Sequence, residues 1–206
     1  MTAPISCHDA LQRLKDGNKR WVAGEHSDES LNAASRREAL ARGQAPFAVV
    51  LSCSDSRAPS EMLFDQGLGD LFVVRVAGNV VAPSLVGSVE FAVQTFGVGL
   101  VVVMGHTACG AVNATLDALL RGPVEGASAN LLDIVQRIRP AVEPLLAVES
   151  DRATLVARAT RANVRASMDQ LCQRSPVLSE HVASGKLLVV GAEYALASGV
   201  VDFFEG

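Results

Sequence analysis

Long apolar runs, clustered basic residues and a signal-peptide core are all missing from this sequence of 206 residues. Its apolar runs are only as long as a strand, so we expect no transmembrane helix. Because the sequence has no basic stripe and no polybasic cluster, neither a nucleic acid nor an anionic membrane is an expected partner. The first twenty residues lack the apolar core of a signal peptide, and we therefore expect a cytoplasmic location.

Charged residues are also scarce, since they make up only 19% of the chain while 49% of its residues are hydrophobic. This composition excludes an intrinsically disordered chain. The net charge at pH 7 is -4, which is modestly acidic. No internal repeat, low-complexity tract or linker divides the sequence. We expect one domain over residues 1–206, with a helical arm over 1–44 and an α/β core over 45–206.

Apolar runs of strand length alternate with helical patterns in the core. This alternation predicts an α/β fold with a mainly parallel sheet that is flanked by helices. In the N-terminal helical arm, Asp16-Gly17-Asn18 interrupts the apolar pattern and predicts a broken or bent helix. The last apolar segment is expected to form a fifth strand or an edge that pairs with another subunit. The strands are expected at about 47–51, 71–76, 100–104, 187–192 and 199–204.

Four cysteines are present, and in a chain of this size and expected location metal binding or catalysis is favoured over disulfides. Cys7 and Cys172 lie in helical patterns and are expected to be ordinary apolar residues. Cys53 directly follows the first strand pattern, and the third leads into His106-x-x-Cys109. Since ligands bind beyond the carboxyl ends of parallel strands, we expect these three side chains to meet.

Cys53, His106 and Cys109 form a Cys2His set, which is one ligand short of a closed tetrahedral zinc site. Three protein ligands and one open position are typical of catalytic zinc. The start of a helix at Cys109 favours the thiolate that a metal needs. The sequence therefore predicts a Zn²⁺ site, although this ligand set alone does not name a reaction.

Asp55 and Arg57 follow Cys53 in the same loop and are spaced to form a bidentate pair. Two arrangements stay open at this point. Asp55 can take the fourth position on zinc and close the site, or Arg57 can hold Asp55 away so that it accepts a hydrogen bond from zinc-bound water. Because these two arrangements exclude one another, the loop is a candidate switch.

Four segments together resemble the β-class carbonic anhydrases, and the two that carry the expected metal ligands are the most specific. Gly17–Trp21, Gly43–Pro46 and Val190–Tyr194 fit the same family, so the resemblance covers nearly the whole chain. The four segments are Cys53–Arg57, Asp70–Asn79, Gly87–Ala92 and Gly105–Gly110.

This resemblance implies reversible hydration of carbon dioxide to bicarbonate and a proton by a carbonate dehydratase. Cys53, His106 and Cys109 would hold zinc, and Asp55 and Arg57 would be the catalytic pair, with Asp55 orienting an attacking zinc-bound hydroxide. The resemblance also implies a homodimer or homotetramer in which the arm embraces a partner.

The resemblance adds substrate contacts around this site. Gln44 matches a family segment whose glutamine contacts substrate, and Gly110 is expected to allow close backbone approach to the site. Some members have a bicarbonate pocket made by a tryptophan, an arginine and a tyrosine. Arg75 and Tyr194 match two of these positions, but Val50 replaces the tryptophan, which argues against the pocket.

Two other functions fit the same sequence. The scaffold can instead hydrolyse carbon disulfide or carbonyl sulfide, since the zinc ligands would be the same and only the access tunnel would differ. A bicarbonate-sensing zinc protein without catalysis would keep Asp55 permanently on the metal. The intact pair of Asp55 and Arg57 argues against this last alternative, because it provides the means to open the site.

Overall fold

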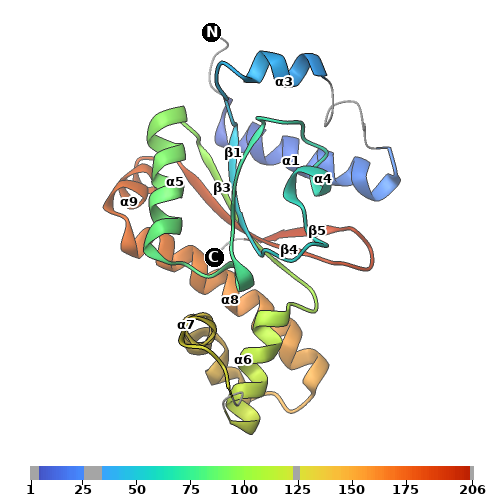
Figure 1. Cartoon of the computed structure of the whole chain (residues 1–206), viewed down its shortest axis with the longest axis vertical. Helices are drawn as coiled ribbons and strands as arrows, with labels where there is room; N and C mark the ends of the chain where they lie inside the picture. Colours follow the sequence, from blue (N-terminus) through green and yellow to red (C-terminus); the bar gives the residue numbers. More distant parts are fainter. Residues whose placement is uncertain (1–4, 26–33, 123–125, 205–206) are drawn as a thin grey trace.

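Five strands form one sheet in the order β2-β1-β3-β4-β5 (Figure 1). The structure is a computed structural model that describes residues 5–25, 34–122 and 126–204. The first four strands in this order are parallel, and β5 pairs antiparallel with β4 at one edge. The predicted α/β fold with a mainly parallel sheet and a fifth strand is therefore confirmed. The strands are β1 (Ala48–Ser52), β2 (Leu71–Arg75), β3 (Leu100–His106), β4 (Leu188–Tyr194) and β5 (Val201–Phe204).

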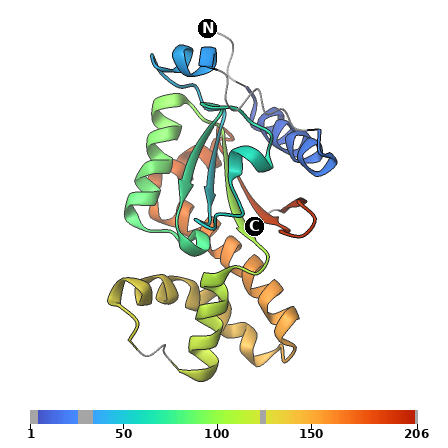
Figure 2. The same ribbon diagram turned by 45° about the vertical axis from the view of Figure 1, so that its right-hand side comes forward.

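Helices cover both faces of this sheet, and a lobe of helices extends beyond one end of it (Figures 1 and 2). In that lobe α6 and α7 pack together, and the long α8 runs from them back to the sheet, where it contacts β3 and β4. The helices are α1 (Cys7–Ala23), α3 (Ala34–Leu40), α4 (Ser60–Leu63), α5 (Pro83–Phe96), α6 (Gly110–Arg121), α7 (Ala129–Val142), α8 (Arg152–Arg174) and α9 (Pro176–Ala183), with 3₁₀ turns η1 (Ala77–Asn79) and η2 (Glu143–Ala147).

Neighbouring residues of a strand point to opposite sides of the sheet, and helices cover both sides, so the central strands are buried on both faces. In β1, Val50 lies in the apolar cluster formed with α1 and α4. Its neighbours Val49 and Leu51 lie in the cluster on the opposite face, which α5, α8 and α9 cover. This burial explains why β1 and β3 appear in the sequence as continuous apolar runs without alternation. The carboxyl ends of the two strands carry their polar side chains, Ser52 in β1 and His106 in β3.

Helix α1 is continuous from Cys7 to Ala23, so the predicted break at Asp16-Gly17-Asn18 is wrong. Gly17 and Asn18 are buried against the core and do not interrupt the helix. A Cβ atom at Gly17 would lie 1.8 Å from the Phe64 carbonyl oxygen, so glycine lets α1 approach α4 closely. Asn18 donates to the carbonyls of Leu63 and Gly199. The polar residues that resembled a helix break are contacts between α1 and the rest of the chain. The sequence also predicts a second helix in the arm, over about 30–42, and α3 forms the described part of it at Ala34–Leu40, while residues 30–33 lie outside the described residues.

Gly17→Ala is expected to lower the free energy of unfolding by about 1–3 kcal/mol, because the added methyl group forces α1 away from Phe64. Urea unfolding followed by circular dichroism measures this change. Gly87→Ala is the matched control, since Gly87 also lies inside a helix but has open space around it. That control is expected to raise the free energy of unfolding by about 0.5–1 kcal/mol. Equal effects of the two substitutions would contradict the close approach at Gly17.

Candidate metal centre

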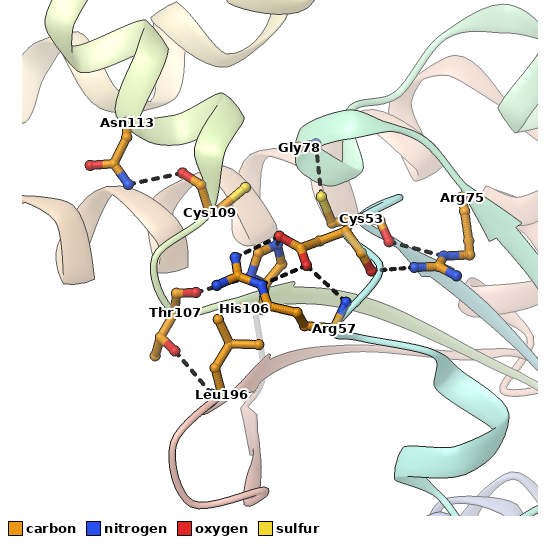
Figure 3. A network of polar contacts seen from close by, with 10 residues as sticks. Cys53, Arg57, Arg75, Gly78, His106, Thr107, Cys109, Asn113 and Leu196 are labelled. Atoms are coloured by element: carbon orange, nitrogen blue, oxygen red, sulfur yellow. Dashed lines mark hydrogen bonds and ion pairs between the residues drawn. The ribbon is translucent and has the colours of Figure 1, made fainter.

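The sulfur atoms of Cys53 and Cys109 and a ring nitrogen of His106 lie within 4.8 Å of one another. Cys53 is the residue after β1, His106 ends β3, and Cys109 is the N-cap of α6. Because β1 and β3 are parallel neighbours, their carboxyl ends deliver Cys53 and His106 to the same edge of the sheet. Figure 3 shows the three side chains converging there. All three are buried, with 6%, 1% and 1% of their surface exposed for Cys53, His106 and Cys109.

The short loop between His106 and Cys109 turns the chain so that Cys109 faces back towards His106. Ala108 has a φ angle of 55°, which is a left-handed conformation uncommon outside glycine. Thr107 ties this loop to the end of β4 and the segment after it (Figure 3). Its backbone N–H donates to the Tyr194 carbonyl at 2.9 Å, and its hydroxyl oxygen accepts from the Leu196 N–H at 3.0 Å. These bonds stabilise the reversal that brings the second thiol to the site.

The orientation of His106 fits a metal ligand. Its Nδ1 lies 2.9 Å from the Thr107 carbonyl oxygen, so Nδ1–H donates there and Nε2 carries the free lone pair. Nε2 is buried and has no hydrogen-bond partner among the described residues. Two thiols and an unpartnered imidazole nitrogen in one buried cluster are the donor set that Zn²⁺ prefers. The residues present therefore fit the predicted metal.

The electrostatics of the cluster indicate a need for a cation. The contact with Cys109 lowers the pKa of Cys53 to about 4, and a hydrogen bond from the Gly78 N–H contributes to this shift. The same contact with Cys53, together with burial, raises the pKa of Cys109. Burial opposes the protonation of His106, but its contact with Cys53 raises the pKa of that imidazole. The two neighbouring thiols therefore oppose each other's ionisation, and a divalent cation would offset the charge on both sulfur atoms.

Asp55 and Arg57 form the expected bidentate pair next to this cluster. Arg57 Nε donates to one carboxylate oxygen at 2.9 Å and Nη2 to the other at 2.7 Å. The backbone N–H of Arg57 adds a third bond at 2.9 Å. These donors hold the pKa of Asp55 well below its usual range. Asp55 Oδ2 also lies 3.8 Å from His106 Nε2, so the carboxylate borders the same space as the metal ligands.

Arg75 lies beside the site and makes two contacts that the sequence did not indicate. It ends β2 and donates to the carbonyl of Cys53 at 3.0 Å and to that of Asp55 at 2.5 Å (Figure 3). It therefore holds the loop that carries both residues. The family's bicarbonate pocket would place this guanidinium on an anion, whereas here two carbonyls engage it. Val50, which replaces the tryptophan of that pocket, is fully buried in the apolar core.

One chain does not bring Gln44 to the metal cluster. Gln44 is exposed and precedes β1, whereas Cys53 follows it. The five residues of β1 alone span about 16 Å between these two ends. In Figure 1 the amino end of β1 lies near α3 at the top and α6 lies below the sheet. Gly110, the first residue of α6, adjoins Cys109, and a Cβ atom there would meet nothing within 4 Å.

Cys7 and Cys172 lie outside the metal cluster, in α1 and α8, and both are free thiols. The prediction that only Cys53 and Cys109 join a histidine agrees with the grouping of ligand atoms among the described residues. None of the helices in the described part of the chain combines the length and the apolar character that a membrane crossing requires.

A buried Cys2His set at the carboxyl edge of a mainly parallel sheet is the arrangement of an α/β metalloenzyme. Residues 48–201 match the family described as carbonic anhydrase. The chain is 42% identical over 200 residues to carbonic anhydrase 2 of Mycobacterium tuberculosis, which covers 96% of this chain and 91% of that protein. It is 43% identical over 193 residues to a carbonic anhydrase of Mycolicibacterium smegmatis, with coverage of 94% and 91%.

A solved structure gives the same result. The β-carbonic anhydrase CafA of Aspergillus fumigatus superposes with a TM-score of 0.74 at 30% identity, which covers 96% of this chain and 89% of the other. The chain therefore belongs to the carbonic anhydrase family, in its β class, and carbonate dehydratase is the activity of that family. The resemblance read from the sequence motifs is confirmed.

Proposed function

We propose that this chain catalyses the reversible hydration of carbon dioxide to bicarbonate and a proton, with Zn²⁺ held by Cys53, His106 and Cys109. The observation that carries this proposal is the buried cluster itself, in which two thiols and the unpartnered Nε2 of His106 lie beside the carboxylate of Asp55. Membership of the carbonic anhydrase family supports the reaction, and the donor set supports the metal.

Zn²⁺ at such a site supplies a nucleophile at near-neutral pH by lowering the pKa of water to about 7, a value known for the three-histidine site of carbonic anhydrase and carried over from it. The protein contributes the shape and polarity around that nucleophile. Three protein ligands would leave one coordination position. Gly110 adjoins Cys109 and carries no side chain, so the small substrate would approach past it.

Asp55 and Arg57 act as a unit in this proposal. Arg57 keeps the carboxylate ionised and fixes both of its oxygens. An ionised carboxylate only accepts hydrogen bonds, so Asp55 would accept one from the attacking water or hydroxide and orient its lone pair towards carbon dioxide. Arg75 supports this geometry because it holds the backbone carbonyl of Asp55.

The alternative arrangement, with Asp55 as a fourth zinc ligand, needs the carboxylate to leave Arg57. Asp55 Oδ2 lies 3.8 Å from His106 Nε2, and this proximity supports a short movement of the carboxylate onto the metal. We propose that the arrangement with Arg57 is the active one and that binding of Asp55 to zinc closes the site.

A homodimer or homotetramer is also part of the proposal, with the arm over residues 1–44 packed on a second copy. Gln44 gives the reason, since it lies at the far end of β1 from Cys53 in its own chain. If Gln44 contacts substrate, as the family resemblance implies, it does so in the site of a second copy. Two β-carbonic anhydrases of Sordaria macrospora are described as tetrameric, and one of them superposes with a TM-score of 0.71 at 26% identity over 96% of this chain and 95% of the other.

Stopped-flow measurement of carbon dioxide hydration by the zinc-loaded chain tests the proposed function. We expect hydration between about pH 7 and about pH 9, the range that brackets ionisation of water on zinc. Removal of the metal with a chelator is expected to abolish hydration, and addition of Zn²⁺ is expected to restore it. No zinc-dependent hydration across this range would reject the proposal. Carbon disulfide and carbonyl sulfide, tested on the same preparation, determine whether carbon dioxide is the preferred substrate.

A further inference from the structure

The turn η1 donates a hydrogen bond to one of the metal-binding sulfur atoms. The backbone N–H of Gly78 lies 3.3 Å from Cys53 Sγ (Figure 3). Hydrogen bonds of this kind draw charge from a thiolate and fix the direction of its lone pairs. The position of this turn therefore affects both the orientation of Cys53 and its charge donation to a metal.

Two successive residues of η1 have unusual backbone conformations. Gly78 has a φ of 69° and Asn79 a φ of 45°, so both lie in the left-handed region. Asn79 is not glycine, so this conformation is unfavourable for it unless neighbouring groups hold it. A Cβ atom at Gly78 would lie 2.7 Å from Ile138 Cδ1 and 3.0 Å from Ala111 Cβ, so the turn is also packed tightly against α7 and α6. Such a turn needs specific partners to hold it.

Helix α8 supplies those partners from two buried polar side chains. Asn163 Nδ2 donates to the Gly78 carbonyl at 2.8 Å, and Ser167 Oγ donates to the Asn79 carbonyl at 3.0 Å. Each side chain is only 2% exposed. They lie four residues apart and so share one face of α8. Each satisfies a carbonyl that would otherwise be buried without a partner.

We propose that Asn163 is a positioning residue for the metal centre, acting through Gly78 on Cys53 Sγ, with Ser167 supporting the same turn. Asn163 hydrogen-bonds Gly78 and not a candidate metal ligand. It fixes the Gly78 carbonyl, which belongs to the Gly78–Asn79 peptide, and across the Gly78 Cα this restricts the preceding peptide, whose N–H faces the sulfur. The inference rests on the proposed zinc site, since it concerns how strongly and in what direction Cys53 donates to the metal.

Thr160, a neighbouring residue of α8, provides a control that distinguishes this positioning role from a general effect on packing. Thr160 is also 2% exposed, but its hydroxyl donates to the Val156 carbonyl within its own helix at 2.9 Å. Thr160→Val therefore removes a buried hydroxyl from α8 without releasing a bond to η1. It controls for the general cost of altering the buried face of this helix.

The test compares Asn163→Leu, Ser167→Ala and Thr160→Val with the unmodified chain, each loaded with Co²⁺ or Zn²⁺. Loss of the N–H bond leaves more charge on the Cys53 sulfur, so Asn163→Leu is expected to shift the sulfur-to-cobalt charge-transfer band to lower energy. Release of zinc to a chelator is expected to become about 10–100-fold faster, the range typical of lost outer-shell partners. Ser167→Ala is expected to shift the charge-transfer band and to speed zinc release in the same direction, but by less. If Asn163→Leu does not fold, Ser167→Ala is the variant that tests the proposal. Thr160→Val is expected to leave the band unchanged.

The outcomes for the inference and for the proposed function are distinct. In one outcome the unmodified chain binds cobalt and hydrates carbon dioxide, but Asn163→Leu and Ser167→Ala show the same charge-transfer band and the same zinc-release rate as Thr160→Val. The positioning role of Asn163 is then wrong, and the proposed function stands. If the shifts occur in a chain that takes up cobalt but does not hydrate carbon dioxide when loaded with zinc, the positioning role stands and the proposed reaction is wrong. A chain that takes up no cobalt overturns both.

Discussion

Cys109→Ala is expected to weaken zinc binding more than about 100-fold and to abolish carbon dioxide hydration, since loss of an outer-shell partner alone costs up to that factor. Cys109 is 1% exposed and lies at the start of α6, where its sulfur meets Cys53 and His106. Alanine at this position leaves one thiol and one imidazole, and two protein ligands do not hold a catalytic zinc. Zinc content after dialysis and stopped-flow hydration measure the two effects.

Cys7→Ala and Cys172→Ala are the matched controls for this substitution. Both thiols are half-buried in helices and lie outside the metal cluster. We expect each control to retain one zinc per chain and the hydration rate of the unmodified protein. Full zinc content and activity in Cys109→Ala, or loss of zinc in either control, would show that the metal site has been assigned to the wrong cysteines.

Asp55→Asn is expected to reduce kcat/KM for hydration about 100-fold or more while zinc content stays the same, because acid–base and orienting groups typically contribute factors of this size. Asparagine has the shape of aspartate but no negative charge, so it loses the bidentate charge-assisted bonds to Arg57. It also presents an amide donor where the attacking group needs an acceptor. Stopped-flow hydration, together with a zinc assay on the same sample, separates this effect from loss of metal.

Asp133→Asn is the matched control, because Asp133 also pairs with an arginine through both carboxylate oxygens but lies on an exposed face of α7. We expect Asp133→Asn to hydrate carbon dioxide at the rate of the unmodified protein. An Asp55→Asn enzyme as active as this control would remove Asp55 from the mechanism. A more active one would instead show that the main role of Asp55 is to close the site by binding zinc.

The residues proposed to bind the metal could be predicted from the sequence because each follows directly from a local pattern. Cys53 and His106 stand at the ends of apolar runs, and a parallel sheet places such ends at one edge. Cys109 follows His106 at a spacing that one short turn can close. The pair of Asp55 and Arg57 was accessible for the same reason, since two residues in one loop need no knowledge of the rest of the fold.

Contacts that join distant segments could not be predicted in this way. The sequence indicated a helix break at Gly17, but α1 is continuous because Gly17 and Asn18 contact the α4 region, about 45 positions along the chain. Arg75 matched one position of an anion pocket that Val50 argued against, and the sequence did not indicate that it binds the carbonyls of Cys53 and Asp55. Asn163 gave only the weak signal of a polar residue in a helix. Its partner, the Gly78 carbonyl, is 85 residues away.

The sequence by itself determined the α/β class, the family and the residues expected to bind zinc, because these depend on periodicity, on strand ends and on short motifs. Only the tertiary structure decided how those residues are held. It placed His106 Nε2 beside two thiols, with no hydrogen-bond partner among the residues that the structure describes. It also placed Arg75 on the loop after β1 and Asn163 behind the turn that bonds to Cys53. The physical reason is that a ligand's identity is a local property, whereas its orientation and charge depend on buried polar groups that the fold brings from distant parts of the chain.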